Sequence, residues 1–218
     1  MRSSVTEFGK PLAAGLAVGA LAIVAWAAVS SAGGQFSWYA ARAAGMVAYL
    51  LAAGSVMFGI ATSTKLGGKL MGKSNVADVH RALSLLSIIA IGAHTLFLGL
   101  DQYADFTLSE LFIPFVTWYR PVWTSFGIIA AYAAIAVYVS FYLRPVIGYK
   151  AWRSFHYIAF AVFGLGTLHG LGSGADSGAA WALAIYGGCT AGVLALLAYR
   201  IASRQPRATV RLDTVRTT

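Results

Sequence analysis

Residues 80–94 read HRALSLLSIIAIGAH, an apolar run that begins and ends with histidine. Residues 156–169 read HYIAFAVFGLGTLH and are framed by histidine in the same way. The chain has four histidines in all, so these two runs hold every one, with separations of 14 residues (80 to 94) and 13 residues (156 to 169). Ionisable side chains within membrane spans are costly and usually functional. Two matched pairs on two spans therefore predict metal or haem sites stacked across a membrane.

The composition is that of a membrane protein. Of the 218 residues 59% are hydrophobic and 11% are charged, whereas a soluble domain carries about a quarter charged residues. A spanning helix needs roughly 20 apolar residues, and backbone polar groups cannot stay unpaired in lipid, which makes such runs helical. We therefore predict an all-α integral membrane protein, a six-helix transmembrane bundle with these spans: Pro11–Ser30, Trp38–Ser63, Val76–Leu100, Val122–Leu143, Ala151–Leu171 and Gly178–Ala202.

The charge distribution predicts the orientation. The formal net charge is +9, but only Arg42 and Arg120 of the 16 basic residues flank one side of the spans. Cytoplasmic loops collect Lys and Arg, so both termini are expected in the cytoplasm, with residues 1–10 before the bundle (11–202) and a basic tail (203–218) after it. Residues 1–32 have features of a signal peptide, but the apolar run is too long for one. We expect a multi-pass protein of the plasma (bacterial inner) membrane, whose basic excess attracts lipid headgroups rather than nucleic acid.

The histidines are predicted to pair by depth. The third and fifth spans run in the same direction, so His80 and His156 lie near the cytoplasm while His94 and His169 lie near the outer face. At 1.5 Å per residue the two levels are about 21 Å apart on one helix and about 20 Å apart on the other. The expected pairs are His80 with His156 and His94 with His169.

The angular positions of the histidines around the helix axis suit two stacked sites better in the third span than in the fifth. Fourteen residues return to within about 40° of the starting face, so the histidines of the third span share a face, with Ser84, Ser87 and Ile91 between them. The small serines would leave room for a flat macrocycle. Thirteen residues end about 140° away. In the fifth span, either Gly164 and Gly166 allow a bend, or the two rings approach their ligands from different sides of the helix.

Two histidines per level favour haem over zinc, which normally takes three or four protein ligands. Cys189 is the only cysteine, so the haem attachment motif C-x-x-C-H is absent. The prediction is two non-covalent b-type haems, each with two histidine ligands. Their propionates would need cations: Arg81 and Arg153, with Lys150, at the cytoplasmic level, and Arg42 at the outer level. The alternative for each of these residues is a lipid anchor whose charged end extends to the headgroups.

Other readings stay open. Histidines can simply join helices by hydrogen bonds, or serve a proton relay, although none of the seven acidic residues lies near the midplane of a span. The third loop, residues 101–121, is rich in aromatic residues, which commonly sit at the membrane interface. The loop could instead be a lid or docking surface over the outer site, because external loops often carry function.

The histidine pattern resembles the ferric-reductase-like transmembrane domain family over approximately residues 40–202. That family includes NADPH oxidases, ferric reductases and the bacterial haem subunit (MsrQ/YedZ type) of the periplasmic methionine sulfoxide reductase system. The segments Tyr119-Arg-Pro121 and Trp152-Arg-Ser-Phe-His156-Tyr157 look like the bacterial members. The unequal histidine spacing is itself similar to that of the oxidases.

The resemblance implies electron transfer from a cytoplasmic flavin, across two haems, to the outer face. Larger members carry an FAD and NADPH module after the sixth span, whereas this sequence ends at Thr218. The expected donor is therefore a separate cytoplasmic flavoprotein or quinol. The sequence does not identify the final acceptor, for which an extracytoplasmic protein is one candidate. The chain would then be an oxidoreductase component, the haem subunit of a multi-protein reductase. The alternatives are a stand-alone reductase of oxygen or ferric chelates, and a non-redox membrane scaffold or transporter.

Overall fold

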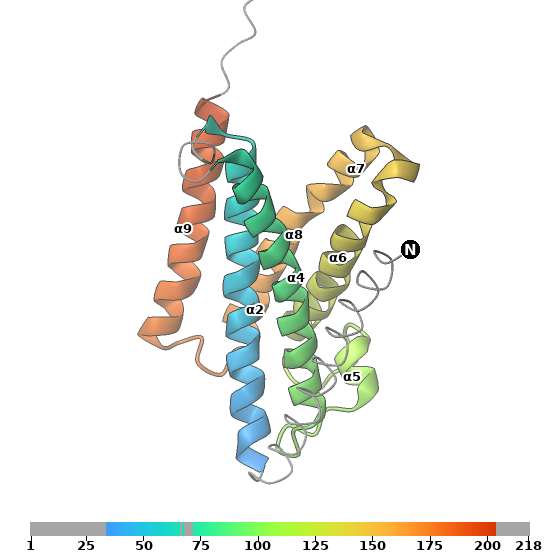
Figure 1. The fold of residues 1–218 in the computed structure, drawn as a ribbon. Helices are drawn as coiled ribbons and strands as arrows, with labels where there is room; N and C mark the ends of the chain where they lie inside the picture. The colour runs from blue at the N-terminus through green and yellow to red at the C-terminus, as the bar shows by residue number, and fades with distance from the viewer. Residues whose placement is uncertain (1–33, 66, 68–71, 204–218) are drawn as a thin grey trace, which may run out of the picture.

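The computed structural model describes residues 34–65, 67 and 72–203. This part of the chain is helical and contains no strand (Figure 1). Its helices are α2 (Gly34–Thr62), α4 (Lys73–Gly99), α5 (Leu108–Phe112), α6 (Pro121–Ile147), α7 (Tyr149–His156), α8 (Ile158–Ser173) and α9 (Ala180–Ala202). The first predicted span, Pro11–Ser30, and residues 204–218 of the predicted tail lie outside the described residues.

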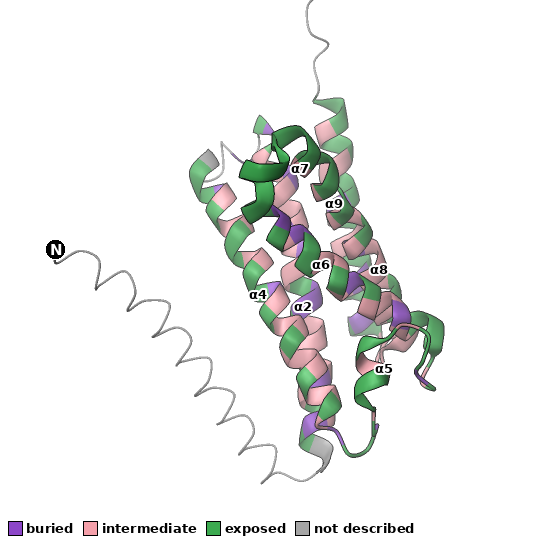
Figure 2. Ribbon diagram, turned by 90° about the vertical axis from the view of Figure 1, so that its right-hand side faces the viewer, coloured by how far each residue is buried: buried purple, intermediate pink, exposed green. Residues whose placement is uncertain are grey.

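Five stretches are long and apolar enough to cross a membrane: Phe36–Thr62, Ser74–Gly99, Pro121–Ile147, Tyr149–Ser173 and Ala180–Ala202. The second to sixth predicted spans are thereby found as apolar helices. Large apolar side chains, among them Leu86, Ile89 and Leu194, stay exposed on the outside of the bundle, and Figure 2 shows exposed positions along every long helix. Such a surface is expected where lipid rather than water surrounds the helices, which is the pattern of a multi-pass membrane protein.

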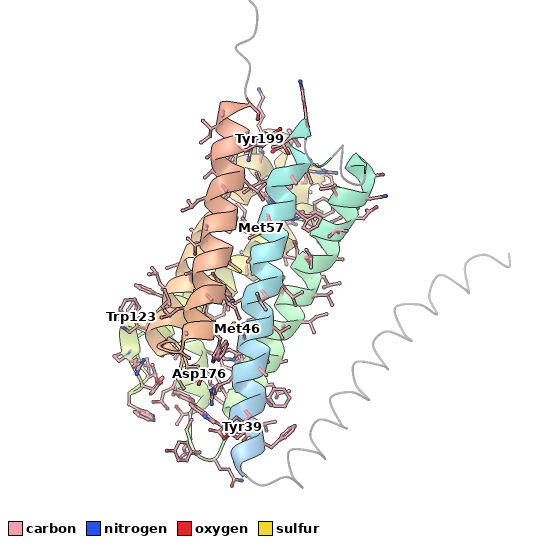
Figure 3. All side chains as sticks on the ribbon, turned by 90° about the vertical axis from the view of Figure 1, so that its left-hand side faces the viewer. Tyr39, Met46, Met57, Trp123, Asp176 and Tyr199 are labelled. Carbon is pink, nitrogen blue, oxygen red and sulfur yellow. The ribbon has the colours of Figure 1, made fainter. Side chains whose placement is uncertain are left out.

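The bundle consists of two helical hairpins and a fifth long helix. α2 packs mainly on α4, and α6 packs mainly on α8, while α9 packs on α2. α4 and α8 run in the same direction (Figure 1). The main buried cluster joins α2, α8 and α9 through Tyr49, which stacks on Phe163 at 5.8 Å between ring centroids and meets Tyr186 edge-on at 4.7 Å. Met46 and Met57 pack against this cluster along α2 (Figure 3).

The predicted fifth span is two helices rather than one. The joint lies at Tyr157, directly after His156, whereas Gly164 lies inside α8. At the joint the Tyr157 N–H bonds the Ser154 carbonyl at 3.3 Å, and the Phe160 N–H bonds the Tyr157 carbonyl at 3.1 Å. These i→i+3 bonds wind the chain more tightly than an α-helix, by roughly 20° per residue. The break in the predicted fifth span therefore lies at Tyr157 and not at the predicted glycines.

The predicted loop between the fourth and fifth spans is almost absent. α6 continues through Pro145 to Ile147, and α7 begins at Tyr149 after Gly148 alone. Gly148 has φ +82°, a left-handed conformation that glycine adopts without a steric penalty. The tight turn brings α7 back against the end of α6, which positions the segment that carries His156.

The third loop is hydrogen-bonded to α6 at two points. The hydroxyl of Tyr132 on α6 donates to the Phe112 carbonyl at 2.7 Å, and the Ser125 hydroxyl accepts the Phe115 N–H at 2.6 Å. The short helix α5 begins with a capping box, in which the backbone N–H and hydroxyl of Thr107 bond Glu110 and lower the pKa of that carboxyl group. The loop therefore has a defined conformation that is held by hydrogen bonds.

Asp101 ties the start of this loop to α2. Its carboxylate, which is 3% exposed, accepts hydrogen bonds from the Ser37 hydroxyl and the Ala104 N–H, both at 2.8 Å. Asp101→Ala leaves that buried N–H without its acceptor, at a cost of about 1–3 kcal/mol. We expect a fall of this size in the free energy of unfolding measured in detergent. Asp78→Ala, which removes an exposed carboxylate, should change it by less than about 0.5 kcal/mol; equal losses in the two variants would contradict the assignment.

Candidate functional site

The four histidines form two pairs between the hairpins. The first pair is His80 on α4 and His156 on α7, with ring centroids 6.0 Å apart and rings at 84°. The second pair is His94 on α4 and His169 on α8, with ring centroids 6.3 Å apart and rings at 74°. The partners expected from depth therefore lie side by side at both levels.

The ring separation matches one metal ion between each pair. A metal bonded at about 2 Å to one nitrogen of each imidazole puts the ring centres roughly 6 Å apart. Among the described residues no group of three or more His, Cys, Asp or Glu side chains could hold a metal ion. The arrangement is thus two donors per level, the number that a haem iron takes from the protein when both axial positions are filled.

Two of the histidines rest in the same kind of cradle on α2. His94 Nδ1 lies 2.7 Å from the Ala41 carbonyl oxygen, and a Cβ atom on Gly45 would lie 2.9 Å from that nitrogen. One level away, His80 Nδ1 lies 2.8 Å from the carbonyl oxygen of Ser55, and a Cβ on Gly59 would lie 3.1 Å from the His80 ring. We call this unit, a helix glycine together with the carbonyl oxygen four residues before it, a glycine–carbonyl cradle.

A third cradle lies on α6. His169 Nδ1 is 2.9 Å from the Trp123 carbonyl oxygen, and a Cβ on Gly127 would lie 2.6 Å from that nitrogen. The spacing of four residues between carbonyl and glycine is the same as on α2. Each hairpin therefore uses its first helix to hold the histidines of its second, except for His156.

The cradles determine which ring nitrogen is free. A carbonyl oxygen only accepts, so Nδ1 must carry the proton in all three neutral imidazoles. Nε2 then keeps its lone pair, and no hydrogen bond to it is found in the described part of the chain. Metal-ligating histidines typically donate their second N–H to a carbonyl or carboxylate in this way, which fixes both the tautomer and the ring orientation. The cradles thus prepare Nε2 as the donor atom.

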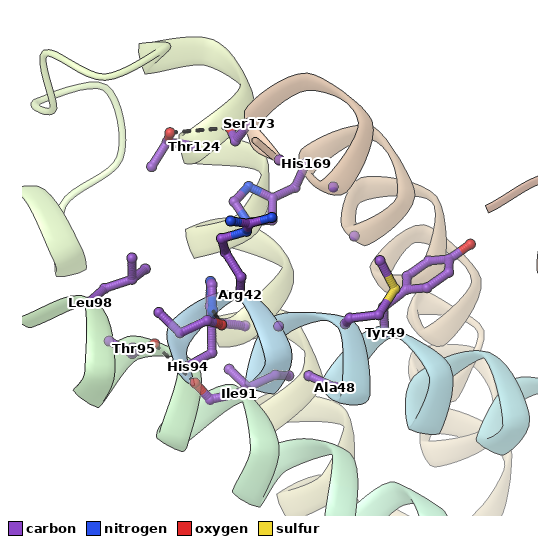
Figure 4. Close-up of a pocket in the computed structure, with 18 of the residues that line it drawn as sticks. Arg42, Ala48, Tyr49, Ile91, His94, Thr95, Leu98, Thr124, His169 and Ser173 are labelled. Carbon is purple, nitrogen blue, oxygen red and sulfur yellow. Dashed lines mark hydrogen bonds between the residues drawn. The ribbon is translucent and has the colours of Figure 1, made fainter. Parts of the chain in front are cut away.

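A cavity of about 1200 Å³ surrounds the second pair. Figure 4 shows His94 and His169 entering it from α4 and α8, with Arg42 from α2. Its volume exceeds the roughly 300–1,000 Å³ of typical ligand pockets. Phe106, Trp118 and Tyr119 of the third loop line it as well, as do many side chains of the helices. The loop therefore covers the second pair, in the position expected of a lid or docking surface.

Three of the four predicted cationic partners differ in their contacts, while Lys150 is exposed. Arg42 lines the cavity and forms an ion pair with Asp176. Arg81 pairs with Asp78 on the exposed surface. Arg153 donates to the hydroxyl of Tyr149 at 2.8 Å and is exposed. The structure brings only Arg42 to a described cavity, while the contacts of Arg81 and Arg153 are those of surface residues.

The glycines of the cradles are functional candidates that sequence reasoning missed. Gly45 and Gly59 are 14 residues apart, the same separation as His80 and His94. Two antiparallel helices keep such spacings in register, so this equality was a usable signal. Ser84, one of the two serines between the histidines of α4, bonds the Ser55 hydroxyl at 2.7 Å and so ties α4 to α2.

Comparison with known proteins gives no match: no family model fits this chain, and no curated protein or solved structure is significantly similar to it. Function must therefore be argued from the site.

Proposed function

We propose that this chain is a membrane electron conduit that holds two b-type haems, one at each histidine pair. The observation that carries the proposal is the set of three cradled histidines. Each has Nδ1 bonded to a carbonyl oxygen, and the two rings of each pair are separated by about the span of one axially ligated metal. Histidines that only joined helices would have no need for Nδ1 bonds to carbonyl oxygens together with a second imidazole beside each ring at both levels.

The residues of the chain have separable tasks in this proposal. Haem bound at both levels supplies one-electron redox chemistry at two depths of the membrane. The imidazoles would hold the iron, and the cradles keep three of them in one tautomer. The apolar wall of the cavity excludes water from the second site, while Arg42 provides a positive charge for a propionate or for an anionic acceptor.

The proposed direction is outward from the cytoplasm. The distribution of basic residues favours cytoplasmic termini in the plasma membrane, which places the first pair inside and the second outside. With a negative cytoplasm, each electron moved outward gains about 2.3 kcal/mol per 100 mV. A cytoplasmic flavoprotein or quinol would supply electrons, and the cavity under the third loop is where an extracytoplasmic acceptor would receive them. The resemblance to the ferric-reductase-like family supports this assignment.

The conduit is tested in sealed vesicles. Proteoliposomes containing the haem-supplemented protein enclose ferricyanide, and dithionite, which does not cross the bilayer, is added outside. We expect the enclosed ferricyanide to be bleached several-fold faster than in vesicles that contain His80→Ala. Because electrons can enter from either end, mixed orientation in the vesicles does not hide the effect. Equal rates with the wild type, the variant and protein-free vesicles would refute the conduit.

The acceptor is tested by reoxidation. The dithionite-reduced protein is mixed with oxygen or with ferric citrate, and the haem absorbance is followed. A haem subunit that serves a separate reductase should be reoxidised slowly by both. Rapid reoxidation by either compound would instead favour the stand-alone reductase.

A further inference from the structure

His156 is the exception among the four histidines. The other three donate to a carbonyl oxygen and rest against a glycine. In the described part of the chain His156 makes no hydrogen bond, and its ring contacts are with His80 and Trp152. It is also the last residue of α7, next to the joint at Tyr157. A ligand at the end of a short helix with no bond to Nδ1 needs another means of orientation.

Trp152 provides such a contact. Its ring stacks on the His156 ring, with centroids 5.1 Å apart and planes at 29°. The two residues are four apart in α7, the spacing that puts side chains on one helix face. Behind Trp152 lie Phe141, whose ring meets it at 6.2 Å, and Arg144, whose guanidinium carbon lies 5.6 Å from its ring centroid. The tight turn at Gly148 brings these α6 residues against it.

The indole nitrogen of Trp152 is buried and has no hydrogen-bond partner. Among the described residues it is the one buried side-chain polar atom found without a partner. An indole N–H can only donate, and an unpaired donor in a low-dielectric interior is unfavourable. The nearby guanidinium of Arg144 makes the surroundings positive, which favours an anionic acceptor. A carboxylate would satisfy both groups.

We propose that Trp152 is the positioning residue of His156, in place of the missing cradle, and that its indole N–H donates to a carboxylate of the macrocycle held by the first pair. The inference rests on the proposed function. It assigns Trp152 and Arg144 to the part that sequence reasoning gave to Arg81 and Arg153, whose contacts lie elsewhere. The face of the indole orients the His156 ring, and the indole nitrogen anchors the macrocycle. Because these two tasks belong to different parts of the side chain, substitutions can separate them.

Two variants and a matched control test it. Trp152→Phe keeps a stacking ring and removes the donor, whereas Trp152→Leu removes both. Phe155→Leu removes an aromatic ring from the same helix that makes no ring contact with His156. The haem-to-protein ratio is measured by the pyridine haemochrome method, the rate of haem transfer to apomyoglobin is followed, and carbon monoxide binding to the reduced protein reports an opened axial position.

Substituting a residue that orients a metal-binding histidine typically lowers metal affinity 10–100-fold. For Trp152→Leu we expect loss of the first haem, or about 10-fold faster transfer together with carbon monoxide binding. Trp152→Phe should keep both haems in low-spin form with transfer only several-fold faster, and Phe155→Leu should match the wild type. If both Trp152 variants match a wild type that holds two haems, this inference fails alone. A wild type without haem overturns the proposed function as well.

Discussion

His94→Ala should lower the haem content from two per chain to one. The two pairs are separate sites, since the His94 ring meets His169, whereas His80 meets His156. Removing one imidazole leaves the second site with a single donor and an enlarged cavity. The first pair keeps both of its rings and the cradle at Gly59, and so should keep its haem. His169→Ala should give the same result, because either partner completes the same site.

The measurement is the pyridine haemochrome absorbance per chain, supported by redox titration. The wild type should titrate in two steps, and each second-pair variant in one. Ile89→Ala, at an exposed position on the same helix, is the matched control and should keep both haems. A ratio that stays at two in His94→Ala and His169→Ala would disprove the assigned pairing.

Gly127→Ala should also empty the second site, although Gly127 has no side chain that could itself bind a metal or haem. An added Cβ would lie 2.6 Å from His169 Nδ1 and about as close to two ring carbons. The imidazole would have to move away from α6 and would lose its bond to the Trp123 carbonyl. Loss of such an orienting bond typically costs 10–100-fold in metal affinity.

The expected loss of haem affinity in Gly127→Ala is opposite to the stabilisation that helix propensity predicts, so it distinguishes the cradle from a general effect on the helix. Alanine is better than glycine in a helix interior by about 1 kcal/mol, so an innocuous Gly→Ala change should stabilise the protein. Gly164→Ala is the control, because nothing lies within 4 Å of the added Cβ. Gly59→Ala, at 3.1 Å from the His80 ring, should weaken the first site less. Equal haem affinities in Gly127→Ala and Gly164→Ala would contradict the cradle.

The depth pairing of the histidines follows from the sequence, whereas their support follows only in part, through the matching spacing of Gly45 and Gly59. Helix rise fixes the height of each histidine once the direction of the spans is known. The cradles depend on the register between neighbouring helices, which no single span determines, so Gly127 could not be assigned to His169 in advance. The role of Trp152 depends on the turn at Gly148, where a loop of several residues was expected.

The same distinction explains the fifth span. Its 13-residue spacing predicted a conflict with a straight helix, and the helix break lies at Tyr157 rather than at the glycines. A glycine within a spanning helix allows a bend there but does not cause one, and Gly164 and Gly166 both lie inside α8. The chain instead tightens at Tyr157, next to the ligand that has to be turned. Likewise, the position of Arg81 in the sequence predicts that it lies at the depth of the first histidine pair. Its side chain instead forms an exposed ion pair with Asp78.

The haem count per chain tests the central claim most directly. The full chain is purified in detergent after expression with added haem precursor, and its pyridine haemochrome is measured against protein concentration. We predict two b-type haems per chain with low-spin spectra, and none in a variant with all four histidines replaced by alanine. A purified, folded wild-type protein without the Soret and alpha bands of b-type haem would contradict the account.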